Sequence, residues 1–337
     1  TSSLVGSEMC IRDRQDIRRS FPNALYFGFT GTPIHEENRK KGATTSMVFG
    51  DCLHRYSIAD GIRDGNVLGF DPYMVLTYRD RDVRQVVALE KAKASTIEEA
   101  QADPAKAEVF YHYMDPNQMP MGPMETQAGE RIKGIEDYLT SAQYAQGTPH
   151  EGKVVEDILD QFPLLSRGNK FHAMLATSSI PEAISYYRLF KERAPQMHVT
   201  ALFDPNVDNS NGAILKGDAL QEIIGDYNEL FGKDFIIPTW PKMKKDITAR
   251  LSHKRPYLTV DQHREERIDL LIVVDQMLTG FDSKWVNTLY LDKIIDYENI
   301  IQAFSRTNRL FGPDKPFGTI RYYRKPHTMR LAIVAYR

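Results

Sequence analysis

Cysteine is scarce in this sequence, with only Cys10 and Cys52 among 337 residues. Two thiols cannot build the disulfide framework on which small secreted folds depend, or a zinc site made of four cysteines. Charge of one sign is not in excess either, because 43 Lys and Arg stand against 45 Asp and Glu, a formal net charge of -2. Such a chain has no global positive field to attract nucleic acid, so any contact with DNA must be local.

Long apolar runs are also missing. No run approaches the roughly 20 residues that a membrane-spanning helix needs, and the first residues lack the charged-then-apolar order of a signal peptide. We therefore expect a cytoplasmic protein with no membrane partner. Metal-ligand spacing is missing as well: His35 begins His-Glu-Glu-Asn, without the second histidine of a zinc-binding helix, so we predict no metal ligands in this chain.

What is present is a regular alternation of strand and helix patterns after residue 151. The expected strands are 170–176, 199–203, 268–274, 288–292 and 319–323, and the expected helices are 154–165, 180–194, 220–231, 243–251 and 298–310. Strands that alternate with helices predict a parallel sheet, and hence an α/β fold. Upstream we expect strands at 23–29 and 73–78 and a short helix at 57–65. Residues 80–150 are rich in Ala, Glu, Gln and Met and are expected to form a partly helical linker.

Three polar residues near the C-terminus could hold an anion. Gln302, Arg306 and Arg309 have the spacing i, i+4, i+7, which would place them on one face of the expected helix. Guanidinium groups bind phosphate oxygens in pairs and stabilise the charge that develops on a transferred phosphoryl group. A solvated helix face that carries arginines explains the same spacing equally well.

Two glycine-containing turns follow expected core strands. Thr279, Gly280 and Asp282 lie after the most apolar strand, and Thr30, Gly31 and Thr32 lie after the first one. Glycine lets the backbone approach a ligand, while hydroxyl, amide and carboxylate groups can hold a phosphate or fix a neighbouring cation. Taken alone, each segment is more simply a tight turn.

Together and in this order, the three segments resemble motifs III, V and VI of superfamily 2 helicases. The resemblance is closest to the restriction (R) subunit of type I restriction-modification enzymes, and it covers most of the chain from about residue 21. Four stretches carry it: FGFTGTPI at Phe27 to Ile34, HRYSIADGIRDGNVLGF at His54 to Phe70, DQMLTGFDSKWVNTLYLDK at Asp275 to Lys293, and IIQAFSRTNRLFG at Ile300 to Gly312.

The resemblance implies two RecA-like domains that hold ATP between them and move along double-stranded DNA. Arg306 and Arg309 would reach the terminal phosphate, with Gln302 beside them. Thr279, Gly280 and Asp282 would link the DNA backbone to the nucleotide, Thr30, Gly31 and Thr32 would couple hydrolysis to movement, and Thr177 and Ser178 would contact the DNA backbone together with Thr279. On this basis residues 21–79 would end the first domain with motif III, 80–165 would be the linker, and 166–337 would be the second domain with motifs IV to VI.

Some of the family's parts are not in this sequence. It has no G-x-x-x-x-G-K-[ST] phosphate loop and no Asp-Glu-x-His box. We find no convincing copy of the family's nuclease site. Residues 1–20 resemble a non-native leader, so we expect this chain to be a fragment whose main ligands for ATP and Mg²⁺ lie upstream, and to be inactive alone.

The implied function is therefore part of an ATP-dependent DNA translocase within a restriction endonuclease. Its partners would be double-stranded DNA and the specificity and modification subunits of the same complex. One alternative is another superfamily 2 helicase or remodelling ATPase. A second alternative is a non-catalytic DNA-binding scaffold with the same fold.

Overall fold

The computed structural model describes residues 19–25, 44–126, 130–203, 213–274, 281–295 and 298–334. Two compact units divide the chain, Thr1–Gly61 and Ile62–Arg337. In the first unit, Thr44 caps the helix α2 (Thr45–Phe49) by accepting a hydrogen bond from the amide of Met47. The helix α3 (Ile58–Arg63) begins where Asp60 accepts bonds from the amide and hydroxyl of Ser57, as expected for a helix in this region.

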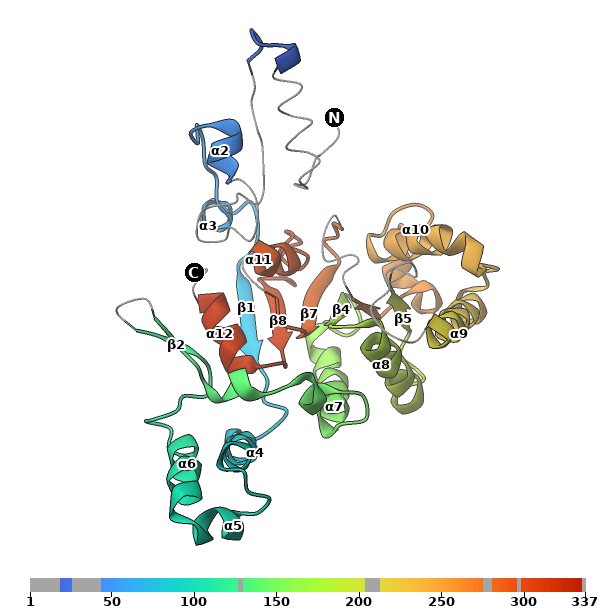
Figure 1. Cartoon of the computed structure of the whole chain (residues 1–337). Helices are drawn as coiled ribbons and strands as arrows, with labels where there is room; N and C mark the ends of the chain where they lie inside the picture. Colours follow the sequence, from blue (N-terminus) through green and yellow to red (C-terminus); the bar gives the residue numbers. More distant parts are fainter. Residues whose placement is uncertain are drawn as a thin grey trace. The chain divides into compact units, whose positions relative to one another are not determined.

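The second unit is built on a six-stranded sheet in which every neighbouring pair is parallel (Figure 1). The strand order is β1-β8-β7-β4-β6-β5. The strands are β1 (Phe70–Met74), β4 (His172–Thr177), β5 (Val199–Leu202), β6 (Leu270–Val273), β7 (Val286–Asp292) and β8 (Gly318–Tyr322). This sheet confirms the predicted α/β class. The connections change direction at β4, which is paired with β7 on one side and β6 on the other.

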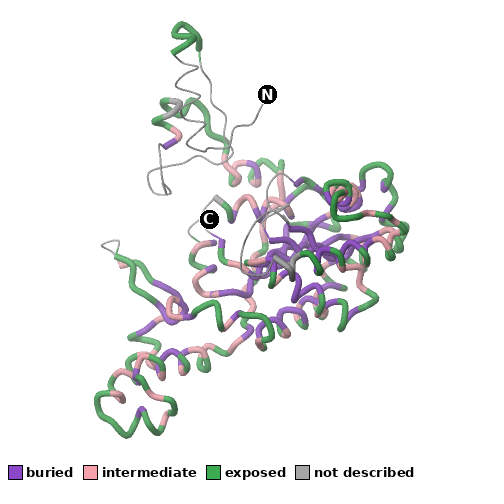
Figure 2. Tube along the Cα trace, turned by 45° about the vertical axis from the view of Figure 1, so that its right-hand side comes forward, coloured by how far each residue is buried: buried purple, intermediate pink, exposed green. Residues whose placement is uncertain are grey.

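Helices cover the sheet and bury its strands. They are α7 (Pro149–Leu165), α8 (Ile180–Arg193), α9 (Ala213–Phe231), α10 (Trp240–Leu251), α11 (Glu298–Phe304) and α12 (Pro326–Val334). All residues of β4, β6 and β7 are buried, as Figure 2 shows in purple. Strands buried on both faces read as continuous apolar runs, which is why the sequence predicted them well. None of the described helices has both the length and the hydropathy to cross a membrane.

The domain boundaries differ from those expected. We placed residues 21–79 in a first domain and 80–165 in a linker, but β1 pairs with β8 along five residues of the main sheet. The helix α7 also packs against this sheet. Its Asp157 accepts hydrogen bonds from Arg321 of β8 at 2.6 and 2.9 Å and from Tyr323 at 2.8 Å. A parallel pairing between distant segments leaves no local pattern in the sequence.

Between β1 and α7 lies a helical insertion with two small cores of its own. It contains α4 (Asp80–Ala92), α5 (Ile97–Ala102), α6 (Pro104–Met114), the hairpin β2 (Met124–Glu125) and β3 (Arg131–Ile132), and two short 3-10 helices, η1 (Ile135–Tyr138) and η2 (Ser141–Tyr144). The buried Arg84 holds it together by donating to the carbonyls of Tyr113 and Met119. This part fits the expected partly helical insertion.

Two buried histidines connect the sheet to the segment after α10. His172 donates from Nδ1 to the carbonyl of Ile268 at 2.5 Å, so its Nε2 is free to accept from Nε2 of His253 at 2.9 Å. Burial lowers the pKa of His172 well below its usual range, and burial lowers the pKa of His253 to about 4. Both rings are therefore neutral in the folded protein at pH 7.

We expect acidification to destabilise the fold through these rings. In the unfolded chain a histidine has a pKa of about 6.5. Below that pH the unfolded state therefore binds protons that the folded state does not bind. The stabilising contribution is complete above pH 6.5 and is lost as the pH falls, by about 1.4 kcal/mol per pH unit for each ring. Urea unfolding between pH 7 and 5 measures it. His253→Phe should have a shallower pH slope than the wild type, and equal slopes would contradict the assignment.

Candidate functional site at the amino edge of the sheet

Parallel strands divide the candidate residues between two opposite edges of the sheet. Asp282 precedes β7, and Arg306 and Arg309 lie on the connection into β8, so these residues lie at the amino ends of the strands. Thr177 and Ser178 end β4, so they lie at the carboxyl edge. The sequence predicted both groups but could not separate them in space.

The amino-edge site joins two segments, 281–286 and 306–315. Arg306 donates from Nε to the carbonyl of Gln302 at 3.0 Å and from a terminal nitrogen to the carbonyl of Phe281. Arg309 donates from Nε to Oδ1 of Asp282 at 2.6 Å, and both side chains are exposed, at 44% and 65%. The structure therefore brings Arg306, Arg309, Asp282 and the backbone of Gln302 together, while their role at a phosphate stays a prediction.

The two arginines are not on a helix, which corrects our expectation. The helix α11 ends at Phe304, and the next residues form a turn in which the amides of Arg306 and Thr307 donate to Ala303 and Phe304. The buried Thr307 hydroxyl also donates to the Phe304 carbonyl at 2.9 Å, a local bond that competes with continued helix. The i, i+4, i+7 face does not form, and the arginines are brought near each other by this turn instead.

The turn is held in place by close backbone contact. The carbonyl of Asn308 accepts from the amide of Leu68 at 2.7 Å, and a Cβ added to Gly318 would lie 2.9 Å from the Thr307 carbonyl carbon. Only glycine leaves room for the turn at this position.

We predict that Gly318→Ala destabilises the protein by about 1–3 kcal/mol, because the extra methyl group overpacks a rigid contact. It should also displace the turn that carries Arg306. Gly69→Ala is the matched control, since Gly69 accepts a hydrogen bond from the amide of Gly318 but its added Cβ would meet only Ile62, at 3.9 Å. Urea unfolding of both variants measures the difference, and equal stabilities would contradict the prediction.

Positive charge is concentrated at this edge. Burial lowers the pKa of Arg306, the neighbouring Arg309 lowers it further, and Asp282 opposes both effects. The guanidinium nevertheless stays protonated at neutral pH, because arginine in proteins does not lose its proton. Since Asp282 is the exposed partner of Arg309, an anionic ligand could replace it without uncovering a buried group.

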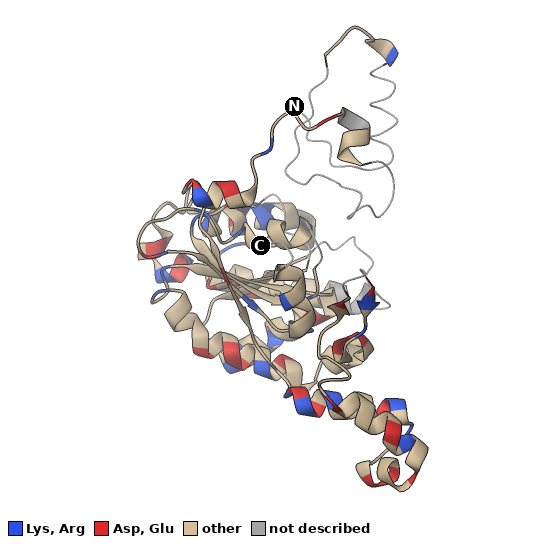
Figure 3. Ribbon diagram, turned by 90° about the vertical axis from the view of Figure 1, so that its left-hand side faces the viewer, with Lys and Arg blue, Asp and Glu red and all other residues tan. Residues whose placement is uncertain are grey.

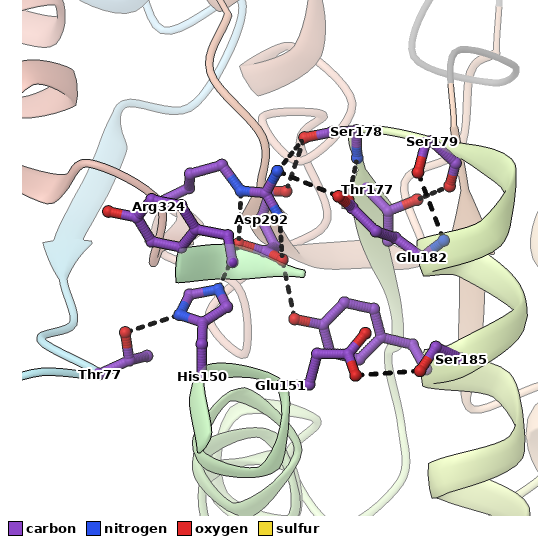
Figure 4. Close-up of polar contacts among 12 residues, drawn as sticks. Thr77, His150, Glu151, Thr177, Ser178, Ser179, Glu182, Ser185, Asp292 and Arg324 are labelled. Carbon is purple, nitrogen blue, oxygen red and sulfur yellow. Dashed lines mark hydrogen bonds and ion pairs between the residues drawn. The ribbon is translucent and has the colours of Figure 1, made fainter. Parts of the chain in front are cut away.

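The carboxyl edge has a different architecture, a buried polar network centred on Asp292 (Figure 4). Its carboxylate accepts from His150 at 2.8 Å, from Tyr186 at 2.8 Å, and from Arg324 at 3.1 and 3.3 Å. Burial raises the pKa of Asp292, but the bonds from His150 and the charge of Arg324 outweigh it and keep the pKa below its usual value. This is the end of the sheet where the strand order reverses, a common place for ligands in α/β proteins. Here protein side chains occupy it.

Ser178 and Thr177 are part of this edge rather than free groups. Ser178 accepts from Arg324 at 2.8 Å and donates to the carbonyl of Asp292 at 3.3 Å, yet the residue is exposed. Thr177 is fully buried, and its hydroxyl donates to the carbonyl of Ser179 at 3.2 Å. Of Thr177 and Ser178, only Ser178 reaches the surface, and Thr279, the third residue expected to contact DNA, lies outside the described residues.

Five of the predicted site residues lie outside the described residues: Thr30, Gly31, Thr32, Thr279 and Gly280. Across the described ranges, no three His, Cys, Asp or Glu side chains gather in a way that could hold a metal ion. The sequence also missed three residues that the structure brings to the two edges, Lys315, Asp292 and Arg324. In the sequence, each of these residues is a polar residue within or near an apolar strand. That pattern alone does not identify a site residue unless the fold is known.

Comparison with known proteins agrees with this architecture. Residues 11–109 match a family model described as SWI2/SNF2 ATPase, and residues 169–325 match one described as Type I restriction enzyme subunit R domain 3. The second match includes β4 to β8, Asp282, Arg306 and Arg309. The described part of the chain thus combines a parallel α/β sheet with matches to an ATPase family model and to an R-subunit family model.

Curated relatives specify the family. The type I restriction enzyme SauCOLORF180P endonuclease subunit of Staphylococcus aureus (strain COL) is 32% identical over 91% of this chain and 28% of its own length. The HindI endonuclease subunit of Haemophilus influenzae is 24% identical over 88% of this chain and 22% of its own length. The chain is a relative of the endonuclease subunits of type I restriction enzymes, as its motifs predicted, and it spans about a quarter of their length.

A solved structure, an ATP-dependent Type ISP restriction-modification enzyme LlaBIII bound to DNA, also matches 86% of this chain and 15% of that protein. Its TM-score is 0.35 and its sequence identity is 12%, so we draw no conclusion from it.

Proposed function

We propose that this chain supplies part of the ATP-dependent motor that moves double-stranded DNA in a type I restriction endonuclease. One observation carries the proposal: two arginines and an aspartate from separate motifs meet at one edge of a parallel sheet, within the region that matches the R-subunit family. The whole enzyme would cleave DNA after translocation, together with its specificity and modification subunits.

ATP fits the amino-edge site by its charge and geometry. Arg309 is exposed and can pair with a terminal phosphate in place of Asp282, while Arg306 lies behind it with its position fixed by two carbonyls. A guanidinium stabilises charge that develops on a phosphoryl group, and a fixed donor does so without reorganisation. Bound ATP would supply the bond whose hydrolysis drives movement. The described residues offer no ligand cluster for Mg²⁺, so we assign that ion to no residue among them.

The remaining roles are proposed from the family's motifs. Thr279 and Gly280, with Asp282, would connect DNA to the nucleotide, and Thr30, Gly31 and Thr32 would couple hydrolysis to movement. Thr177 would support Ser178, which would contact the DNA backbone. Acidic and basic residues are interspersed along the described ribbon (Figure 3), so DNA contact would depend on local groups rather than on one long basic segment.

Stimulation by DNA tests the proposal. The full-length protein should hydrolyse ATP faster when double-stranded DNA is added, together with its partner subunits if they are required. Persistent inactivity of the full-length complex would instead support a non-catalytic scaffold. A SWI2/SNF2-type remodelling motor is the second candidate, because that family model matches residues 11–109. DNA-stimulated hydrolysis without any cleavage of DNA would favour it.

A further inference from the structure

A buried lysine lies next to the arginine site. Lys315 is 1% exposed, although it lies in the short loop between Phe311 and β8. Lysine is rarely buried to this extent unless its ammonium group finds partners. Its Nζ donates to the carbonyl of Lys284 at 2.9 Å and to the carbonyl of Val286 at 2.8 Å. Both acceptors belong to the chain that directly follows Asp282.

Lys315 therefore completes a set of three connections between the same two segments. Arg306 contacts the carbonyl of Phe281, Arg309 pairs with Asp282, and Lys315 fixes the carbonyls at the start of β7. The first and third connections are made to backbone atoms and are partly or fully buried, whereas the middle one is exposed. The exposed pair of Arg309 and Asp282 therefore lies between two less accessible contacts, one made by Arg306 and one made by Lys315.

The loop that carries Lys315 is itself fixed. Its amide donates to the carbonyl of Gly312 at 3.0 Å, and Gly312 has a φ of 136°, a conformation that other residues rarely adopt. The neighbouring Asp314 pairs at 2.5 Å with Lys170, which precedes β4, and these side chains are 56% and 37% exposed. Such a surface pair contributes little, so the buried lysine makes the stronger contact that holds this loop.

We infer that Lys315 is a positioning residue that sets the distance between Arg309 and Asp282 and thereby aims the arginine at the phosphate site. This inference rests on the function proposed above. Burial lowers the pKa of Lys315 to about 7, the charge of Arg309 lowers it further, and Asp282 opposes both effects. A displacement of about 1 Å at such a site is enough to cost up to 10²-fold in rate.

The test is a double-mutant cycle in the full-length protein, with DNA-stimulated ATP turnover as the measurement. Lys315→Met keeps the buried volume but removes the donors, and we expect kcat to fall about 10- to 100-fold with little change in KM. Lys170→Met is the matched control, because it removes the partner of Asp314 on the same loop, and it should stay within about twofold of the wild type. In an Arg309→Ala background, Lys315→Met should slow turnover no further, because its effect acts through Arg309.

The possible failures are distinguishable. Wild-type turnover in Lys315→Met, beside a slow Arg309→Ala, would overturn this inference alone. Equal factors in both backgrounds would also overturn it, since they indicate a general structural effect. Wild-type turnover in Arg309→Ala would overturn the proposed function and this inference with it. If Lys315→Met does not give folded protein, Lys315→Gln takes its place in the cycle, and the same outcomes apply.

Discussion

Arg309→Ala in the full-length protein is expected to lower ATP turnover by about 10³-fold or more, and Arg306→Ala by a similar factor. Arg309 has an exposed guanidinium, and its ion-pair partner among the described residues is the exposed Asp282, so it is accessible to a terminal phosphate. Arg306 fixes the turn through the carbonyls of Gln302 and Phe281. Arg306→Ala therefore removes a positive charge and also the contacts that hold the turn carrying Arg309.

Two controls sharpen this prediction. Arg188→Ala removes another exposed arginine from a carboxylate pair, with Glu222 at 2.7 Å, outside the four stretches that carry the family resemblance, and should leave turnover unchanged. Arg309→Lys keeps the charge but loses the planar fork, so its rate should fall between those of the wild type and Arg309→Ala. Near-normal turnover in both alanine variants would remove the basis for the ATP site.

Asp292→Ala is expected to lower the free energy of unfolding by about 3–5 kcal/mol, because it leaves the charge of Arg324 buried without its main partner. The carboxylate is completely buried and accepts bonds from three side chains, so its removal also leaves His150 and Tyr186 without an acceptor. Urea unfolding provides the measurement.

Asp314→Ala serves as the matched control. It breaks a surface ion pair with Lys170 and should leave the free energy of unfolding close to that of the wild type. Replacing Asp292 and Arg324 together with Leu and Met should recover part of the lost stability, because it removes the buried guanidinium that Asp292→Ala leaves without its main partner. Equal effects of Asp292→Ala and Asp314→Ala would show that the network contributes no more than a surface pair.

The sequence predicted the buried strands and most helices correctly, because continuous apolar runs and 3.6-residue periodicity are local signals. The strand expected at 170–176 is β4 at His172–Thr177, and the helix expected at 180–194 is α8 at Ile180–Arg193. The pairing of β1 with β8 was missed, since nothing near Phe70 indicates its distant partner.

The candidate site was predicted in composition but not in geometry. Asp282, Arg306 and Arg309 were named from the motifs and lie in contact, but the helix expected to reach residue 310 ends at Phe304. The helix ends early because Thr307 bonds to its own turn and packs against Gly318, a tertiary contact that no local propensity encodes. Lys315 was missed for a related reason. Lysine is usually exposed, so the sequence alone predicts a surface residue here, whereas the structure buries it.

The most direct test of the ATP site compares two nucleotide states in one protein. The full-length wild type and Arg309→Ala would be titrated with ADP alone and with ADP plus aluminium fluoride, which mimics the transferred phosphoryl group. We predict similar ADP affinities for both proteins and an affinity for the mimic that is at least about 10²-fold weaker in Arg309→Ala, since enzymes bind transition-state mimics through groups that act at that stage. Equal affinities for the mimic would contradict the assignment of Arg309 to the terminal phosphate.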